Sequence, residues 1–203
     1  VFSFRSGTRT FDADIPWGNA TATLRWNHVF SKKLFSNTSL IFNDYRFSFS
    51  GTQNNFDIRF SSGISDLNGK LDFDYFASFR HHIKFGGNYI HHRFTPYSIS
   101  GRQDSTRFNP ENAFRKYAHE AALYVMDDWE ISSRLKLNLG LRYSGFQQIG
   151  PYTRYKEDAG GAKIDSTVYT NWEPVRSYGG LEPRAILRYP WKSRNSLKGS
   201  LSP

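Results

Sequence analysis

The 203-residue sequence contains no cysteine, so it has neither a disulfide framework nor a cysteine-based zinc site. It contains no run of 18 apolar residues, which excludes a transmembrane helix. Membrane strands stay possible, because their apolar residues alternate with polar ones. No basic run exceeds two residues, although the net charge is +9. We therefore expect no nucleic-acid partner, since nucleic acids are bound by clustered Lys and Arg side chains.

Catalytic motifs are missing as well, because the sequence has neither a G-x-S-x-G nucleophile elbow nor a P-loop. Asp72 and Asp74 would lie on one face of a strand, about 7 Å apart, a separation compatible with glycoside hydrolysis. We interpret them instead as carboxylates of a polar wall, balanced by Lys70 and by arginines on adjacent strands. The sequence thus predicts neither an enzyme nor a bound cofactor.

Two histidine pairs, His81-His82 and His91-His92, suggest a metal site. Neighbouring residues of a strand face opposite sides, so neither pair can chelate one ion directly. Further ligands would have to come from other strands, and no spacing in the sequence points to them. We interpret all four as solvated or rim histidines and predict no metal site.

The clearest pattern that is present is a strict alternation between residues 135 and 144. Its apolar positions are Leu135, Leu137, Leu139, Leu141 and Tyr143, and the residues between them are Lys136, Asn138, Gly140, Arg142 and Ser144. Side chains of a strand point to opposite faces with period 2, so this strand has one aliphatic and one polar face. A β-sandwich with an interior core produces such a strand, and so does a membrane barrel with lipid outside and water inside.

Alternation elsewhere predicts an all-β chain: an antiparallel meander of about nine long strands, the first and last cut by the chain ends. The seven complete strands lie near residues 20–30, 34–50, 56–76, 82–94, 117–131, 135–146 and 180–189, and the last strand starts at Leu197. Residues 7–18 are expected to form a polar loop. The first residues do not resemble a signal peptide, so we expect an internal fragment of a longer protein.

The phase of two strands is ambiguous. Leu40 and Phe42 lie on one parity, whereas Phe47 and Phe49 lie on the other, which a bulge or a twisted segment clear of a membrane would reconcile. Residues 66–69 could be a hairpin turn or a bulge inside one strand. We predict one bent strand over 56–76 with a bulge there, because a single crossing places all long loops on one rim. The long loops are 96–116 and 147–177, and the short turns lie near Lys32, Ser133 and Ser193.

Strand length and aromatic positions favour the membrane barrel. Several strands run for more than the roughly 9–11 residues that a tilted membrane strand needs, whereas soluble strands centre near ~5–6 residues. Aromatic residues make up 17% of the chain and gather near strand ends, as interfacial girdles require. Those near the ends are Trp17, Trp26, Phe30, Trp129, Tyr143, Tyr189 and Trp191.

Several segments resemble a known family in their order and spacing. Residues 124–129 (YVMDDW) followed by 135–143 (LKLNLGLRY) are similar to a hairpin of TonB-dependent outer-membrane receptors. Residues 182–184 (EPR) with 196–198 (SLK) resemble the next hairpin, particularly in receptors of Bacteroidetes. Residues 24–28 (LRWNH) with 34–38 (LFSNT) also resemble that group.

The resemblance implies a bacterial outer-membrane barrel of 22 strands with an N-terminal plug domain. Such receptors import scarce ligands with energy that TonB supplies through the plug. Residues 1–203 would then be a partial barrel domain, without the plug and the remaining strands. The implied partners are outer-membrane lipid, TonB through a plug region outside this chain, and a small ligand such as a siderophore or an oligosaccharide.

The long loops are the expected place for ligand contacts, because specificity is usually carried on loops held by a rigid scaffold. They combine stacking faces with cations, and the residues we predict to contact ligand are Arg107, Tyr152, Arg154, Tyr155 and Trp172. A competing hypothesis from the pattern alone is a soluble, surface-attached carbohydrate-binding β-sandwich or barrel. The two hypotheses differ in whether Leu137, Leu139 and Leu141 lie beneath a second sheet.

Overall fold

The computed structural model describes residues 2–6, 9–54, 56–103, 106–108, 115–158, 160–192 and 195–201, without the side chains of 2–11, 106–108, 191, 192, 195 and 196. The described residues are almost entirely strands. These are β1 (Phe2–Ser6), β2 (Arg9–Asp14), β3 (Trp17–Ser31), β4 (Leu34–Gln53), β5 (Phe56–Phe76), β6 (His81–Gln103), β7 (Thr106–Phe108), β8 (Lys116–Ser132), β9 (Leu135–Ile149), β10 (Tyr152–Glu157), β11 (Lys163–Tyr169), β12 (Pro174–Lys192) and β13 (Asn195–Leu201).

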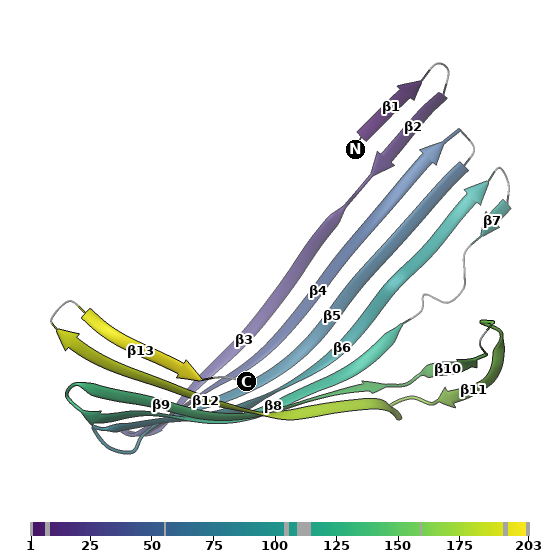
Figure 1. Cartoon of the computed structure of the whole chain (residues 1–203). Coiled ribbons are helices and arrows are strands. Elements are labelled where there is room, and N and C mark those ends of the chain that lie inside the picture. The colour runs from purple at the N-terminus through teal and green to yellow at the C-terminus, as the bar shows by residue number, and fades with distance from the viewer. Residues whose placement is uncertain are drawn as a thin grey trace.

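The strands form one curved, open sheet and one small hairpin (Figure 1). The main path runs β1-β2-β4-β5-β6-β8-β9-β12-β13, every pairing between the described strands is antiparallel, and β3 also pairs with β4. β2 and β3 follow one another along β4, and the backbone N–H of Ser48 donates to the Pro16 carbonyl at their junction. Within the described residues no pairing joins the two ends of the path, so the meander is confirmed as an unclosed wall.

The register gives the sheet two chemically different faces. Paired residues share a face, and the pairs Leu123↔Tyr143, Val125↔Leu141 and Leu71↔Gly87 place the apolar rows of successive strands side by side. We call this side the leucine face, defined by Leu24, Leu40, Leu71, Leu123 and Leu141. The opposite side is the charged face, defined by Asp72, Lys84, Tyr124, Asp128 and Arg142.

The sheet has almost no interior core. Only Ala118, Ala122 and Ile149 are buried apolar residues in the described part of the chain, and Leu123 is 69% exposed. The accessible surface is 15089 Å², whereas a compact monomer of 23.5 kDa exposes roughly 9,800 Å². Leu139 and Leu141 stay 43% and 46% exposed, so the described chain provides no second sheet that covers them.

One end of the sheet carries short turns and the other carries long hairpins (Figure 1). The turns at 32–33 and 133–134 are short, as predicted, while that near Ser193 falls outside the described residues. At the opposite end β6 continues to Gln103 and pairs with β7, and residues 152–169 contain β10 and β11. The predicted loops at 96–116 and 147–177 are therefore largely strands. The predicted loop at 7–18 is likewise wrong, because it contains β2 and the start of β3.

β5 is a single strand of 21 residues, which confirms the predicted single crossing. The expected bulge at 66–69 is wrong, because β4 and β5 pair without a register shift from Leu34↔Tyr75 to Gln53↔Phe56. The ambiguous phase of β4 does not come from a bulge; its apolar residues change faces. Phe42 lies on the leucine face, whereas Phe47 and Phe49 lie on the same side as the charged face. This is the arrangement expected of strands that continue beyond a membrane.

Aromatic rings border the leucine face at both ends. Near the short turns, Trp26, His28, Phe30, Phe73 and Phe85 form a chain of ring contacts with centroid separations of 4.5 to 6.2 Å. Towards the long hairpins lies a second cluster of Tyr89, His91, Tyr117, His119 and Trp172. Trp17 does not belong to either, because its pairing with Phe47 places it on the opposite side. The side chain of Trp191 is outside the described residues.

Gly86 marks a close approach of two backbones. A Cβ at this position would lie 2.2 Å from the Leu71 carbonyl oxygen and 3.0 Å from the Asp72 Cα atom. We expect Gly86→Ala to lower the free energy of unfolding of the intact protein by about 1–3 kcal/mol, since the backbone must shift. Urea unfolding followed by tryptophan fluorescence measures this.

The matched control for Gly86→Ala is Gly69→Ala on β5. A Cβ at Gly69 would have no atom within 4 Å, so this variant should be neutral or more stable by up to about 1 kcal/mol. Equal effects of the two substitutions would contradict the close-approach explanation.

Candidate functional site

The charged face is covered by ion pairs and charge-assisted hydrogen bonds that link neighbouring strands. His92 Nδ1 lies 2.8 Å from Asp66 Oδ1, and its Nε2 lies 3.6 Å from Glu120 Oε2. Further pairs are Lys84 with Asp128 (3.8 Å), Arg142 with Glu182 (3.9 Å) and Lys136 with Glu130. Asn138 donates to Asp128, and Ser144 donates to Glu182. Such a surface is suited to water or to a polar protein element, and its charges are largely balanced locally.

Asp72 and Asp74 are both engaged in this network. Asp72 accepts a hydrogen bond from the Tyr124 hydroxyl at 2.6 Å and lies 2.9 Å from Lys70 Nζ. Asp74 lies 2.8 Å from His82 Nε2. The expected partner Lys70 is confirmed, but the expected arginines are wrong, because tyrosine and histidine take their place. Two carboxylates held in this way are wall residues, as the sequence analysis interpreted them.

The four predicted histidines are less solvated than expected. His81 Nδ1 lies 2.7 Å from Asp127, and the side chains of His82 and His92 are half-buried beside their carboxylates. His91 stacks on Tyr117 and on Trp172. Among the described side chains no group of three or more His, Asp or Glu residues is arranged to hold a metal ion. Each histidine therefore has a partner that the sequence spacing alone did not identify.

Three of the predicted ligand contacts lie on the hairpin β10–β11. Its register, Tyr152↔Tyr169 and Arg154↔Thr167, puts Tyr152, Arg154 and Tyr169 on one face. The Arg154 guanidinium lies 5.3 Å from the Tyr169 ring centre, and Lys116 Nζ lies 5.9 Å from that of Tyr152. Because Lys116 is on the charged-face parity of β8, this hairpin face is contiguous with the charged face.

Tyr155 occupies the other face of the same hairpin. Lys163 Nζ lies 3.9 Å from its ring centre, and the side chain is 50% exposed. The predicted set is therefore divided between two faces of one hairpin. Arg107 is further away in the chain, on β7, where its backbone pairs with Arg102; its side chain is outside the described residues.

Trp172 lies at the base of the hairpin, against the leucine face. Its ring stacks on His91 and His119 at 5.5 Å in each case, and its φ is 68°. A left-handed backbone at a bulky residue costs of order 1–3 kcal/mol, which the two ring contacts offset. In this position the ring extends the aromatic cluster that lies towards the long hairpins. The ligand contact predicted for Trp172 stays a prediction.

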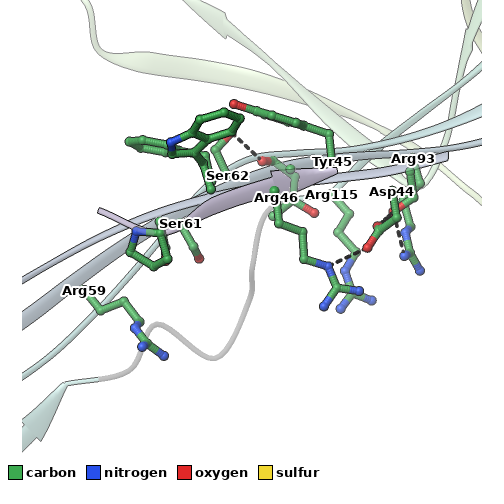
Figure 2. Close-up of a pocket in the computed structure, with 16 residues that line it drawn as sticks. Asp44, Tyr45, Arg46, Arg59, Ser61, Ser62, Arg93 and Arg115 are labelled. Carbon is green, nitrogen blue, oxygen red and sulfur yellow. Dashed lines mark hydrogen bonds and ion pairs between the residues drawn. The ribbon is translucent and has the colours of Figure 1, made fainter. Parts of the chain in front are cut away.

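A group of arginines on the leucine side was missed by sequence reasoning. Arg46, Arg59, Arg93 and Arg115 lie on the same side of the sheet as Asp44, whereas Tyr45 lies on the other (Figure 2). They line a shallow hollow beyond the apolar rows. The hydrogen bond from Ser65 is the main cause that lowers the pKa of Asp44, which lies beyond those rows, and the guanidinium groups of Arg46 and Arg93 lower it further. The only sequence signal was the change of phase within β4.

Among the described residues no helix is long and apolar enough to span a bilayer. No curated protein matches the sequence. Two solved structures share the fold. One is BauA, the ferric preacinetobactin receptor of Acinetobacter baumannii, with a TM-score of 0.53 and 12% identity over 95% of this chain and 30% of that chain. The other is Fiu, the ferric-catecholate import receptor of E. coli K12, with a TM-score of 0.55 and 13% identity over 97% of this chain and 33% of that chain.

The sequence itself matches a family model described as "TonB dependent receptor-like, beta-barrel" over residues 2–202. The chain spans about a third of the length of the two solved receptors. Its exposed leucine face, its aromatic borders and its hairpins at one rim are features of outer-membrane barrels. Nothing in these comparisons points to the soluble carbohydrate-binding alternative. The chain belongs to the family of TonB-dependent receptors, as part of an outer-membrane β-barrel.

Proposed function

We propose that residues 1–203 are a wall segment of a receptor that imports a ferric siderophore or a similar scarce anionic ligand, driven by TonB through a plug domain elsewhere in the protein. The observation that carries this proposal is the continuity between the charged face and the Tyr152–Arg154 face of the β10–β11 hairpin. A ligand captured by that hairpin would move along a wall of paired charges. The charged face interacts with water or the plug, and the leucine face with lipid.

An anionic, iron-bearing ligand suits the chemistry of the long hairpins. Lys116, Arg154 and Lys163 each lie over a tyrosine ring, so cations and stacking faces occur together. The net charge of +9 attracts anions to this segment. The two structural neighbours are described as receptors of ferric preacinetobactin and of ferric catecholates, which supports the same ligand class. Stacking rings would also suit an oligosaccharide, so the test includes one.

The test measures accumulation of iron-55 siderophore by cells that express the full-length receptor and lack other siderophore receptors. We expect accumulation at least about tenfold above cells without the receptor, since specific ligand contacts supply several kcal/mol. The gain should disappear in cells without functional TonB. Uptake that does not require TonB, or uptake of a labelled oligosaccharide with none of ferric siderophore, would contradict the proposal.

A further inference from the structure

Beyond its apolar rows, the leucine side of the sheet becomes cationic. Arg46 on β4, Arg59 on β5, Arg93 on β6 and Arg115 before β8 are far apart in the sequence. The pairs Arg46↔Gly63 and Ser65↔Arg93 bring them together across adjacent strands. In Figure 2 their side chains extend from the same side of the sheet, with Arg59 apart from the other three. We call these four residues the arginine cluster.

Among the described residues, Asp44 is the one carboxylate that lines the hollow of the arginine cluster. Asp44 Oδ2 lies 2.6 Å from Arg46 Nε, and Asp44 Oδ1 accepts a hydrogen bond of 2.5 Å from Ser65. Arg93 donates to the Ser65 hydroxyl at 3.0 Å. Within the described part of the chain neither Arg59 nor Arg115 forms an ion pair, and the Arg46 side chain is 80% exposed. The cluster therefore presents a net positive charge with donors available to an anion.

Asp44, Arg46 and Arg93 lie at or just above the height of the lipid headgroups, whereas Arg59, which pairs with Ser50, lies further out. Asp44 and Arg46 are two and four residues beyond Phe42, the last ring of the leucine face on β4, so they lie about 7 and 13 Å along the strand. With a strand tilt of about 40°, these distances become heights of about 5 and 10 Å. A headgroup layer is about 5–8 Å thick on each side of the hydrocarbon. Because long hairpins mark the extracellular rim of such barrels, the layer is that of the outer leaflet.

We propose that the arginine cluster binds the phosphate groups of an anionic lipid in the outer leaflet. Guanidinium groups donate paired hydrogen bonds to phosphate oxygens, so they hold a phosphate group better than a single ammonium would. The register places Ser48 and Ser61 on the same side, where their hydroxyls can donate as well. The site is on the opposite face from the proposed ligand path, so it does not depend on the proposed ligand.

The test measures binding of diphosphoryl lipid A to the full-length receptor in dodecyl maltoside micelles by native mass spectrometry. We expect the triple variant Arg46→Gln, Arg59→Gln and Arg115→Gln to weaken binding at least about tenfold, since each charge-assisted contact contributes. Asp44→Asn removes the competing carboxylate that lies among the described residues of the hollow, and it should strengthen binding by about two- to threefold. The two variants act in opposite directions, so a loss of folding cannot imitate both.

The matched control is the triple variant Arg25→Gln, Arg184→Gln and Arg188→Gln. It removes the same charge from the charged face, where these arginines form no ion pair among the described side chains. Binding should change less than about twofold. An equal loss in both triple variants would overturn the proposal, as would equal binding of lipid A without its phosphates. Displacement by inorganic phosphate at equal concentration would show a site for free phosphate and would also overturn it.

Discussion

Leu123→Arg is expected to lower the free energy of unfolding of the full-length receptor in lipid vesicles by about 2–4 kcal/mol. Leu123 lies six residues from Trp129 and six from Tyr117 on the same strand face, which places it near the middle of the hydrocarbon. Its cross-strand partners on the leucine face, Gly87 and Tyr143, bring no carboxylate that an arginine could pair with. The measurement is urea unfolding from phosphatidylcholine vesicles, followed by tryptophan fluorescence.

The control for this substitution is Leu123→Met, which keeps the side chain apolar and of similar volume. It should change the free energy of unfolding by less than about 1.5 kcal/mol. If the arginine were tolerated as well as the methionine, the leucine face would not be in hydrocarbon. The membrane orientation of the whole sheet would then be wrong, because every strand shares this face.

Replacement of Tyr152 and Arg154 by alanine is expected to weaken binding of the ferric siderophore by the full-length receptor at least about tenfold. Both residues lie on the hairpin face that is contiguous with the charged face, and Tyr169 and Lys116 surround them. Removing an aromatic ring and a guanidinium from a capture surface commonly costs more than about 1.4 kcal/mol, which is a factor of ten in affinity. Quenching of tryptophan fluorescence by added ligand gives the affinity.

The hairpin supplies its own matched control. Tyr155 and Lys163 also form a cation–tyrosine pair, but on the opposite face. The double variant Tyr155→Ala and Lys163→Ala likewise removes one tyrosine ring and one cation, and we expect a change of less than about threefold. If instead the Tyr155 and Lys163 variant weakened ligand binding more, the Tyr152–Arg154 face would not be the face that binds ligand. That result would support the predicted ligand contact of Tyr155.

The period-2 pattern correctly predicted the strands in which each face has the same surroundings, lipid or water, along its whole length. Leu135 to Tyr143 lie on a single face as expected, and β5 crosses once. The pattern failed where the environment changes along a strand, as in β4 between Phe42 and Phe47. It also failed in β6, which continues through Pro96. That proline lies at the register shift between Ser61↔Ser98 and Gly63↔Thr95, where the ladder needs no N–H from it.

The candidate sites were harder to predict because they depend on register between strands. Nothing in the sequence links Arg46 with Arg93, which are 47 residues apart and meet only through the pairing of β4, β5 and β6. The separation of Arg154 from Tyr155 follows from period 2 once residues 152–157 form a strand. Because that segment was predicted to be an irregular loop, the placement of Arg154 and Tyr155 on opposite faces was not predicted. The partners of Asp72 and Asp74 could be predicted only as far as Lys70, the one that is local in sequence.

The apolar residues of β4 and β5 change faces along these strands, so the inner surface of this wall has two successive regions of different chemistry. Beyond the bilayer it presents rings, with Phe47 and Phe60 in contact at 6.5 Å. Below them it presents paired charges from Asp66 to Asp128. A solute that enters from outside would therefore meet the aromatic part of the inner surface before the part that is covered by ion pairs. The apolar groups of such a molecule would contact the rings first, and its charged groups would contact the ion pairs afterwards.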